Sequence, residues 1–404
     1  MKRRLRASGD VARACSIADL RAMAQCRLPS FVFEYLEGGA EDEVTLRRNR
    51  AVFEDLAFVP TTLVKAGAVD TTRTIFDQPA KLPLMIAPMG FCGLFSHRGD
   101  VSLARAASAA GIPFIQSTVS NASIEDIAAV PGLRHWMQLY VFRSRPFMER
   151  LVARALAANC EALVITTDAS VFGNREWDRR NYRRATEPTF RNKVDVLLHP
   201  RWMRDVVLRG IPAFQNLLEV LPPDQQTLAA SATWSRREVD PDLDWERVSW
   251  LRSLWPRKLV LKGLLAPVDV KQALGIGVDG VVLSNHGGRQ LDGAISPMTV
   301  LPEIASRFGG DMTILIDSGF RRGTDIVKAI ALGADGVLLG RPVLYGLAAG
   351  GEAGVRKAID TLGEEFARAL ALLGRPSIAQ LDPTCLYRAD ANRMAQYEKA
   401  ERLV

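Results

Sequence analysis

Cysteine and histidine are scarce in this 404-residue chain, which holds five cysteines and four histidines. The cysteines show no paired or metal-like spacing, and an odd number cannot pair completely; they are Cys15, Cys26, Cys92, Cys160 and Cys385. A disulfide framework is therefore not expected, and a reducing compartment is favoured. With four histidines, a multi-histidine metal site is not expected either, and we predict no bound metal.

Long apolar runs are also missing. No stretch approaches the ~20 consecutive apolar residues that a membrane-spanning helix needs. The first six residues are basic, but no apolar stretch follows them, so a secretory signal is not expected. The net charge of +7 leaves nucleic acid, an anionic membrane and acidic ligands open as partners. Because no recognised nucleic-acid-binding module occurs, we expect no nucleic-acid partner.

Eight short apolar runs recur along the chain, and alanine-rich stretches such as 100–110 and 324–332 separate most of them. The runs cover residues 84–87, 114–116, 136–140, 162–166, 259–262, 280–284, 313–317 and 336–339. Eight strands that alternate with helices predict an α/β fold, the (β/α)8 TIM barrel. Gly111 and Gly333 are expected to follow helices in the left-handed conformation.

The expected barrel occupies residues 81–350 of what we expect to be one domain, residues 1–404. Residues 1–80 precede it and are predicted to be helical over 17–26, 29–38 and 42–56. The gap between the fourth and fifth strands is far longer than the others, which predicts an insertion at about 176–255. Residues 351–404 are predicted to form further helices and a polar tail.

The most informative stretch is Ser284-Asn285-His286-Gly287-Gly288-Arg289-Gln290-Leu291-Asp292, just past the sixth expected strand. His286 can take a proton at neutral pH, and Arg289 can hold a carboxylate with two parallel hydrogen bonds. Together they suit proton abstraction from a small acid. The alternative is a glycine-rich loop with a solvated histidine and arginine.

Barrel enzymes place their catalytic groups at the C-terminal ends of the strands, and other polar residues fall there. Lys262 ends the fifth strand as either a surface lysine or a buried cation that faces a ligand. Asp168 follows the fourth strand as either a helix cap or the acid that orients His286. Arg321 and Arg341 lie in glycine-rich turns after the last two strands, where we predict a phosphate site; exposed arginines are the alternative.

These motifs resemble one family, the FMN-dependent 2-hydroxy acid dehydrogenases and oxidases. The 284–292 run matches the family signature without a gap, Tyr35-Leu36-Glu37-Gly38-Gly39-Ala40-Glu41-Asp42 also matches, and the resemblance extends from about residue 16 to 374. The stretches 294–298, 316–323 and 344–349 are most similar to the family members that oxidise (S)-mandelate.

The resemblance implies a catalytic set of His286, Asp168, Tyr140, Lys262, Tyr35, Arg175 and Arg289. His286 would take the α-proton or the hydroxyl proton of the substrate, and Asp168 would pair with it. Arg289, Arg175 and Tyr35 would bind the substrate carboxylate. Tyr140 would contact the substrate hydroxyl, and Lys262 would face the part of the flavin that becomes negative in the reaction.

The resemblance also implies FMN as the cofactor, bound by Pro88, Met89, Gly90, Ser117, Gln138, Thr166, Lys262, Ser284, Asp317, Ser318, Gly319, Phe320, Arg321, Gly340 and Arg341. Oxidases of the family often have alanine at the position of Gly90, so this glycine favours a dehydrogenase. Glycolate oxidases have tryptophan at the position of Val119, so a glycolate-type pocket is not favoured.

The expected reaction is the oxidation of an (S)-2-hydroxy acid to a 2-oxo acid, with electrons passed to a quinone-type membrane acceptor. The preferred substrate is (S)-mandelate, which would give phenylglyoxylate. L-Lactate dehydrogenation, and (hydroxy)mandelate oxidation by O2, are the alternatives within the family. A phosphate-binding isomerase or an FMN-dependent isopentenyl isomerase fits less well, because His286 and Arg289 with the separate Arg175 suit a carboxylate. The resemblance implies a homo-oligomer, a tetramer.

The expected insertion is basic and contains aromatic residues. Residues 175–209 hold ten Arg or Lys against five Asp or Glu, interleaved with aromatic and aliphatic side chains. This composition favours a membrane surface, with nucleic acid or a solvated active-site flap as alternatives. Because membrane-bound members of the family have their membrane segment in this insertion, we expect a cytoplasmic enzyme attached peripherally to the inner face of the membrane.

Overall fold

The computed structural model describes residues 5–184, 187–210 and 213–388. Eight parallel strands form a closed barrel, in the spatial order β10-β11-β12-β13-β4-β5-β6-β7. The strands are β4 (Leu84–Ile86), β5 (Phe114–Gln116), β6 (His135–Leu139), β7 (Ala162–Thr166), β10 (Lys258–Leu264), β11 (Gly280–Leu283), β12 (Thr313–Ile316) and β13 (Gly336–Leu339). The predicted barrel is confirmed, and every strand ends within two residues of its predicted run.

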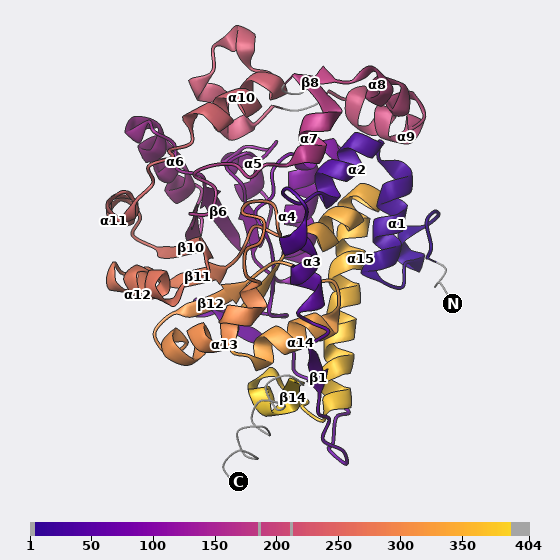
Figure 1. Ribbon diagram of the computed structural model, residues 1–404, viewed down its shortest axis with the longest axis vertical. Coiled ribbons are helices and arrows are strands. Elements are labelled where there is room, and N and C mark those ends of the chain that lie inside the picture. Colours follow the sequence, from indigo (N-terminus) through magenta and orange to yellow (C-terminus); the bar gives the residue numbers. More distant parts are fainter. Residues whose placement is uncertain (1–4, 185–186, 211–212, 389–404) are drawn as a thin grey trace, which may run out of the picture.

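Helices cover the outside of this barrel (Figure 1). They are α4 (Gly99–Ala110), α5 (Ile124–Ala128), α6 (Arg145–Ala157), α12 (Pro267–Gly275), α13 (Pro297–Phe308), α14 (Gly323–Ala331) and α15 (Arg341–Leu373). Gly111 and Gly333 follow α4 and α14 with φ of 66° and 100°, as predicted. The large core lies between strands and helices, and a second apolar cluster that includes Trp136, Val164 and Val282 fills the barrel.

The N-terminal extension is only partly helical. It contains α1 (Ile17–Arg27), α2 (Ser30–Glu37) and α3 (Val44–Ala51), followed by β1 (Leu56–Phe58), β2 (Arg73–Ile75) and β3 (Gln78–Ala80). The prediction of a helix over 42–56 was therefore too long, and the three strands were missed. β1 pairs with β14 (Leu386–Arg388), more than 300 residues away in the sequence, and local periodicity carries no information on such a partner. Ile75 and Ala80 of the β2–β3 hairpin join the apolar cluster inside the barrel.

The insertion follows β7, as predicted. Its main elements are α7 (Glu176–Asn181), β8 (Tyr182–Arg184), β9 (Glu187–Pro188), α8 (Phe190–Leu197), α9 (Pro200–Trp202), α10 (Leu228–Glu238) and α11 (Trp245–Leu254). Figure 1 shows α7, α8, α9 and α10 together at one end of the molecule, while β1 and β14 lie at the other. Residues 185–186 and 211–212 of the insertion lie outside the described residues, as do 1–4 and 389–404 of the predicted termini. Among the described helices, none is both long and apolar enough to span a membrane.

Candidate active site

A cavity of about 900 Å³ opens at the C-terminal ends of the barrel strands. It is lined by the loops that follow most of the strands, by α2 and by α10. Most of the predicted site residues line it: Tyr35, Pro88, Met89, Gly90, Tyr140, Arg175, Lys262, His286, Arg289, Asp317, Ser318, Gly319, Phe320, Arg321, Gly340 and Arg341. The barrel therefore brings together residues that are up to 306 positions apart in the sequence.

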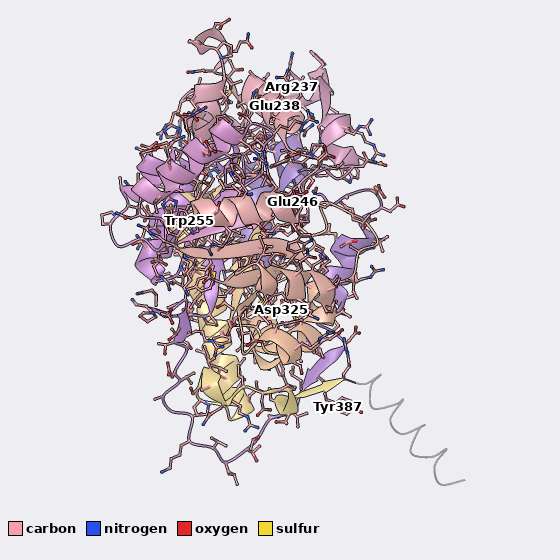
Figure 2. All side chains as sticks on the ribbon, turned by 90° about the vertical axis from the view of Figure 1, so that its left-hand side faces the viewer. Arg237, Glu238, Glu246, Trp255, Asp325 and Tyr387 are labelled. Carbon is pink, nitrogen blue, oxygen red and sulfur yellow. The ribbon has the colours of Figure 1, made fainter. Side chains whose placement is uncertain are left out.

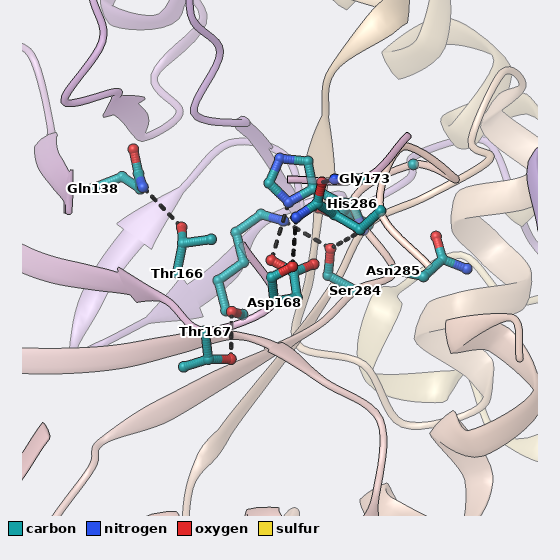
Figure 3. A network of polar contacts seen from close by, with 12 residues as sticks. Gln138, Thr166, Thr167, Asp168, Gly173, Ser284, Asn285 and His286 are labelled. Atoms are coloured by element: carbon teal, nitrogen blue, oxygen red, sulfur yellow. Dashed lines mark hydrogen bonds and ion pairs between the residues drawn. The ribbon is translucent and has the colours of Figure 1, made fainter. Parts of the chain in front are cut away.

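His286 and Asp168 form a pair at this end of the barrel. The Nδ1 atom of His286 lies 3.0 Å from Oδ1 of Asp168 (Figure 3). Of the two interpretations of the sequence, this contact agrees with Asp168 as the acid that orients His286 and not with a helix cap. Burial raises the pKa of Asp168, but His286 and Lys262 oppose this and leave the pKa below its usual value. An ionised carboxylate only accepts hydrogen bonds, so Nδ1–H of His286 is the donor of this bond, while Nε2 makes no hydrogen bond in the described part of the chain.

The backbone of His286 has φ of +59°, which is rare for a residue with a side chain. Its own N–H donates to Oγ of Ser284 at 3.0 Å, and the N–H of Gly287 donates to Oγ of Ser318 at 3.0 Å. These contacts hold the loop in a conformation that it would not otherwise favour. Backbone strain of this kind costs on the order of 1–3 kcal/mol and clusters at functional sites.

Arg289 is anchored to the backbone on one side only. Its Nη1 donates to the carbonyl oxygens of Tyr35 and Gly38, each at 2.8 Å. The Nε and Nη2 donors keep no partner in the described part of the chain, and this edge can hold a carboxylate with two parallel bonds. Burial, and then the nearby Arg175, lower the pKa of Arg289, so the pair of guanidinium groups is stabilised when an anion enters.

Two phenol groups complete this end of the cavity. Neither the hydroxyl of Tyr35 nor that of Tyr140 has a hydrogen-bond partner among the described residues, and both side chains line the cavity. Burial raises the pKa of both tyrosines, and the nearby Asp168 raises that of Tyr140 further. Both therefore remain neutral O–H donors at physiological pH.

Lys262 is a buried cation, as the second interpretation of the sequence predicted. Its side chain is 5% exposed, and Nζ lies 2.9 Å from Oδ2 of Asp317 and 2.7 Å from Oγ of Ser284. Burial lowers its pKa, but Asp317 and Asp168 raise it more, so the net pKa is above the usual value and Lys262 stays charged. A fixed positive charge at the cavity wall stabilises negative charge on a bound ligand.

The predicted phosphate site consists mainly of open backbone groups. The N–H groups of Gly319, Phe320 and Gly340 donate no hydrogen bond within the described ranges. Arg321 lines the cavity beside them and holds its guanidinium 5.6 Å from the centre of the Tyr345 ring. Free N–H groups next to an arginine can bind an anion, and this chemistry fits the phosphate group of FMN. The placement of the FMN ring at Lys262 stays a prediction.

Arg341 has mostly another role. Four of its five donors bond to carbonyl oxygens, namely those of Leu36, Glu37, Gly38 and Gly287. Three of these carbonyls lie at the C-terminal end of α2, which is thereby held against the barrel. Burial lowers the pKa of Arg341 to about 10. One N–H on Nη1 remains for a ligand, so the predicted phosphate contact stays a prediction.

Five predicted site residues lie behind the cavity wall rather than on it: Ser117, Gln138, Thr166, Asp168 and Ser284. Gln138 donates to Oγ1 of Thr166 at 2.8 Å (Figure 3) and accepts from Oγ of Ser117 at 3.2 Å. This network ties together the ends of β5, β6 and β7. The direct contact to the flavin that the resemblance implied for Ser117, Gln138, Thr166 and Ser284 stays a prediction.

Several residues at the site were missed by the sequence analysis. Gln290 of the signature loop bonds to the loop that carries Asp168 and Arg175. Aromatic residues and α10 of the insertion also line the cavity, through Phe91, Phe95, Phe172, Phe214, Ala232, Ser235 and Arg236. The side chain of Gln290 could have been noted from its place in the signature. The α10 residues could not, because nothing local to them indicates that the insertion folds back over the barrel.

Comparison with known proteins agrees with this geometry. The family model described as FMN-dependent dehydrogenase matches residues 24–388. The chain is 45% identical over 373 residues to an (S)-mandelate dehydrogenase of Pseudomonas putida, covering 92% of this chain and 93% of that protein. It is 42% identical over 373 residues to an L-lactate dehydrogenase of Allorhizobium ampelinum, covering 92% and 98%.

A solved structure described as the monotopic membrane protein (S)-mandelate dehydrogenase superposes with a TM-score of 0.89, at 44% identity. The match covers 93% of this chain and 100% of that structure. This chain therefore belongs to the FMN-dependent dehydrogenase family, the FMN-dependent enzymes that act on 2-hydroxy acids.

Proposed function

We propose that this protein oxidises (S)-mandelate to phenylglyoxylate. The observation that carries the proposal is that His286 and Arg289 line one cavity, while Nε2 of the histidine and the Nε and Nη2 donors of the arginine have no partner among the described residues. Arg289 and Arg175 hold the substrate carboxylate, and the Tyr140 hydroxyl contacts the substrate hydroxyl. His286 then takes a proton from the substrate, and Asp168 stabilises the imidazolium that results. FMN, when bound, supplies the acceptor for two electrons.

The wall around the expected side-chain position supports an aromatic substrate. Phe91 and Phe214 meet edge to face with ring centres 4.6 Å apart, and Phe172 lies 6.3 Å from the Tyr140 ring. A phenyl ring makes favourable edge and face contacts with such a wall, whereas a methyl group leaves most of it uncovered. L-Lactate is the second candidate, because one of the similar proteins carries that name.

The experiment that tests the substrate is anaerobic bleaching of the flavin by a panel of (S)-2-hydroxy acids. We expect (S)-mandelate to reduce the flavin with a higher kcat/KM than phenyllactate, L-lactate or glycolate. A higher kcat/KM for L-lactate than for mandelate would overturn the proposal in favour of the second candidate. A yellow protein that none of these acids bleaches would overturn both.

We also propose that the electrons pass to a quinone-type membrane acceptor and not to O2, and that the protein binds the membrane through α8. Phe190, Val194, Leu197 and Leu198 lie at i, i+4, i+7 and i+8, on one face, and all four are exposed. The exposed Arg191 and Lys193 flank this face, which suits an anionic lipid surface.

We also propose that the protein lies at the cytoplasmic face of the membrane. In the described part of the chain, no helix is long and apolar enough to span a membrane. Sedimentation with anionic liposomes tests it: binding at low salt supports the proposal, and a protein that stays in the supernatant contradicts it. The family resemblance further supports a single domain that assembles as a homotetramer. Light scattering of the detergent-purified protein would give the mass of the assembly.

A further inference from the structure

One face of α10 lines the cavity beyond the aromatic wall. Ala232, Ser235 and Arg236 are the cavity-lining residues of this helix, and the i+3 and i+4 spacing places Ser235 and Arg236 each next to Ala232. Phe214, which also lines the cavity, touches Phe91 of the aromatic wall. The helix therefore closes the end of the cavity at which the side chain of the substrate would lie.

Ser235 lines the cavity, and its hydroxyl has no partner in the described part of the chain. The residue is 4% exposed, yet its Oγ makes no hydrogen bond in the described part of the chain. Its neighbours on α10 behave differently: Ser231 donates to the carbonyl oxygen of Leu228 at 3.0 Å, and Thr233 donates to that of Ala229 at 2.8 Å. Because Ser235 lines the cavity and its Oγ is not among the fully buried side-chain atoms, this hydroxyl is accessible to a ligand or water there.

Arg236 is also without a partner. This exposed arginine forms no ion pair or hydrogen bond among the described residues. The adjacent Arg237 does not line the cavity, and it bonds to Oε1 of Glu238 at 2.8 Å (both residues are labelled in Figure 2). Ser235 can accept and donate, and Arg236 can only donate. Between them they match a group that has one O–H and one oxygen lone pair.

We propose that Ser235 and Arg236 form a subsite for a hydroxyl group on the ring of the substrate, so that the preferred acid is a ring-hydroxylated mandelate. The phenol O–H donates to Oγ of Ser235, and the phenol oxygen accepts from the guanidinium of Arg236. This inference rests on the proposed function, because it places the carboxylate of the substrate at Arg289. It names the substrate class more narrowly than the aromatic wall does.

The test compares anaerobic flavin reduction by (S)-mandelate and (S)-4-hydroxymandelate in the FMN-bound enzyme. The wild type should favour the hydroxylated acid in kcat/KM, and Ser235→Ala should reduce this preference by about 2- to 10-fold, the effect of one hydrogen bond. Arg236→Met should reduce it as well. Arg237→Met is the matched control and should leave the ratio unchanged. Alanine is a good helix former, so Ser235→Ala should keep α10 intact.

The outcomes separate the two proposals. If the wild type uses both acids equally well, or if Ser235→Ala leaves their ratio unchanged, the subsite is wrong while the oxidation of mandelate stands. If neither acid reduces the flavin but L-lactate does, the proposed function fails first. A ratio that falls in Ser235→Ala and in Arg236→Met, but not in Arg237→Met, supports the subsite.

A second inference comes from Gln290, which bridges two loops of the site. Its Nε2 donates to the carbonyl oxygen of Asp168 at 2.6 Å and to that of Val171 at 3.1 Å, and its Oε1 accepts from the N–H of Gly173 at 2.9 Å. A Cβ on Gly173 would lie 2.4 Å from the carbonyl oxygen of Arg289, so the two loops touch through their backbones. One side chain thus sets the position of the segment between Asp168 and Arg175.

We infer that Gln290 is a positioning residue that aligns Asp168 with His286 and Arg175 with Arg289. Gln290→Met keeps the length of the side chain and removes all three hydrogen bonds. It should retain FMN but weaken substrate binding and flavin reduction by about 10- to 100-fold, since displacements near 1 Å have effects of this size. The neighbouring Leu291→Ala, at an exposed position, is the control and should change neither.

A double-mutant cycle distinguishes positioning from a general loss of stability. If Gln290 acts on substrate binding through Arg175, then Gln290→Met should add little to the Kd of an enzyme that already contains Arg175→Met. Additive losses in Kd would show that Gln290 does not act through Arg175. Unchanged Kd and reduction rate in Gln290→Met alone would overturn the inference.

Discussion

Two pairs in this molecule consist of the same residue types, a histidine and an aspartate, but lie in different surroundings. At the barrel end, His286 and Asp168 are 118 residues apart in the sequence and meet at 3.0 Å. In the insertion, His199 and Asp195 are one helical turn apart, and Nδ1 of His199 bonds to the backbone carbonyl of Asp195 at 2.8 Å. In the first pair, His286 lines a cavity together with Arg289, and its Nε2 has no partner in the described ranges. The second pair stabilises the end of α8.

The same contrast holds for the two regions as wholes. At the barrel end, polar side chains that are distant in sequence bond to one another, and the donors left free converge on one cavity. In the insertion, large apolar side chains are left on the surface, with Phe190 78%, Leu197 66% and Leu198 73% exposed. The barrel therefore supplies fixed geometry for chemistry, and the α8 region supplies a surface suited to a lipid interface.

The largest effect is expected when His286 is replaced, with the same replacement of His199 as the control. His286→Asn should retain FMN but slow anaerobic reduction by mandelate by at least about 10²–10⁴-fold, because a general base is lost. His199→Asn should leave the reduction rate near that of the wild type. Stopped-flow absorbance measures both rates. Reduction of His286→Asn at the wild-type rate would show that another group takes the proton.

The next effect concerns the anchored edge of Arg289. Arg289→Lys should raise the KM for mandelate by about 10- to 100-fold, the range of one or two charged hydrogen bonds, because lysine cannot bond to Tyr35 and Gly38 and also present a two-donor edge. Arg48 also bonds to two backbone carbonyls but lies outside the cavity, so Arg48→Lys is the matched control. An unchanged KM in Arg289→Lys would indicate that Arg175, and not Arg289, binds the substrate carboxylate.

A third prediction tests the insertion. Replacing Phe190, Leu197 and Leu198 by serine should abolish the part of liposome binding that salt does not remove, while mandelate oxidation in solution stays intact. Serine at Leu63 and Leu372, which are exposed near the β1–β14 end, is the control and should not affect binding. Sedimentation at low and high salt measures the effect. Equal binding of both variants would show that α8 is not the attachment surface.

The smallest effect is expected at Gly90. A Cβ there would lie 2.6 Å from Cγ2 of Val119, so Gly90→Ala requires Val119 to move and changes access to the flavin face. We expect a few-fold faster reaction of the reduced enzyme with O2, measured by oxygen uptake, and a modest loss in mandelate reduction. A wild type that already reacts rapidly with O2 would contradict the dehydrogenase interpretation.

Much of the fold was predictable because its signals are local. Each barrel strand is a short apolar run between helices, and the burial of both faces by the barrel requires that composition. The signature loop was equally visible, since His286, Arg289 and the two glycines are neighbours in the chain. The strands β1, β2 and β3 were missed because they are short, and β1 depends on a distant partner.

By itself, the sequence determined the barrel, the position of the insertion, the family and the chemical types at the strand ends. Only the tertiary structure decided which alternative each side chain adopts: Lys262 buried against Asp317, Asp168 paired with His286, and Arg341 bonded largely to the end of α2. It also brought Ser235 and Gln290 to the site. The physical reason is that periodicity and composition report local environment, whereas these roles depend on contacts between segments that only the closed barrel brings together.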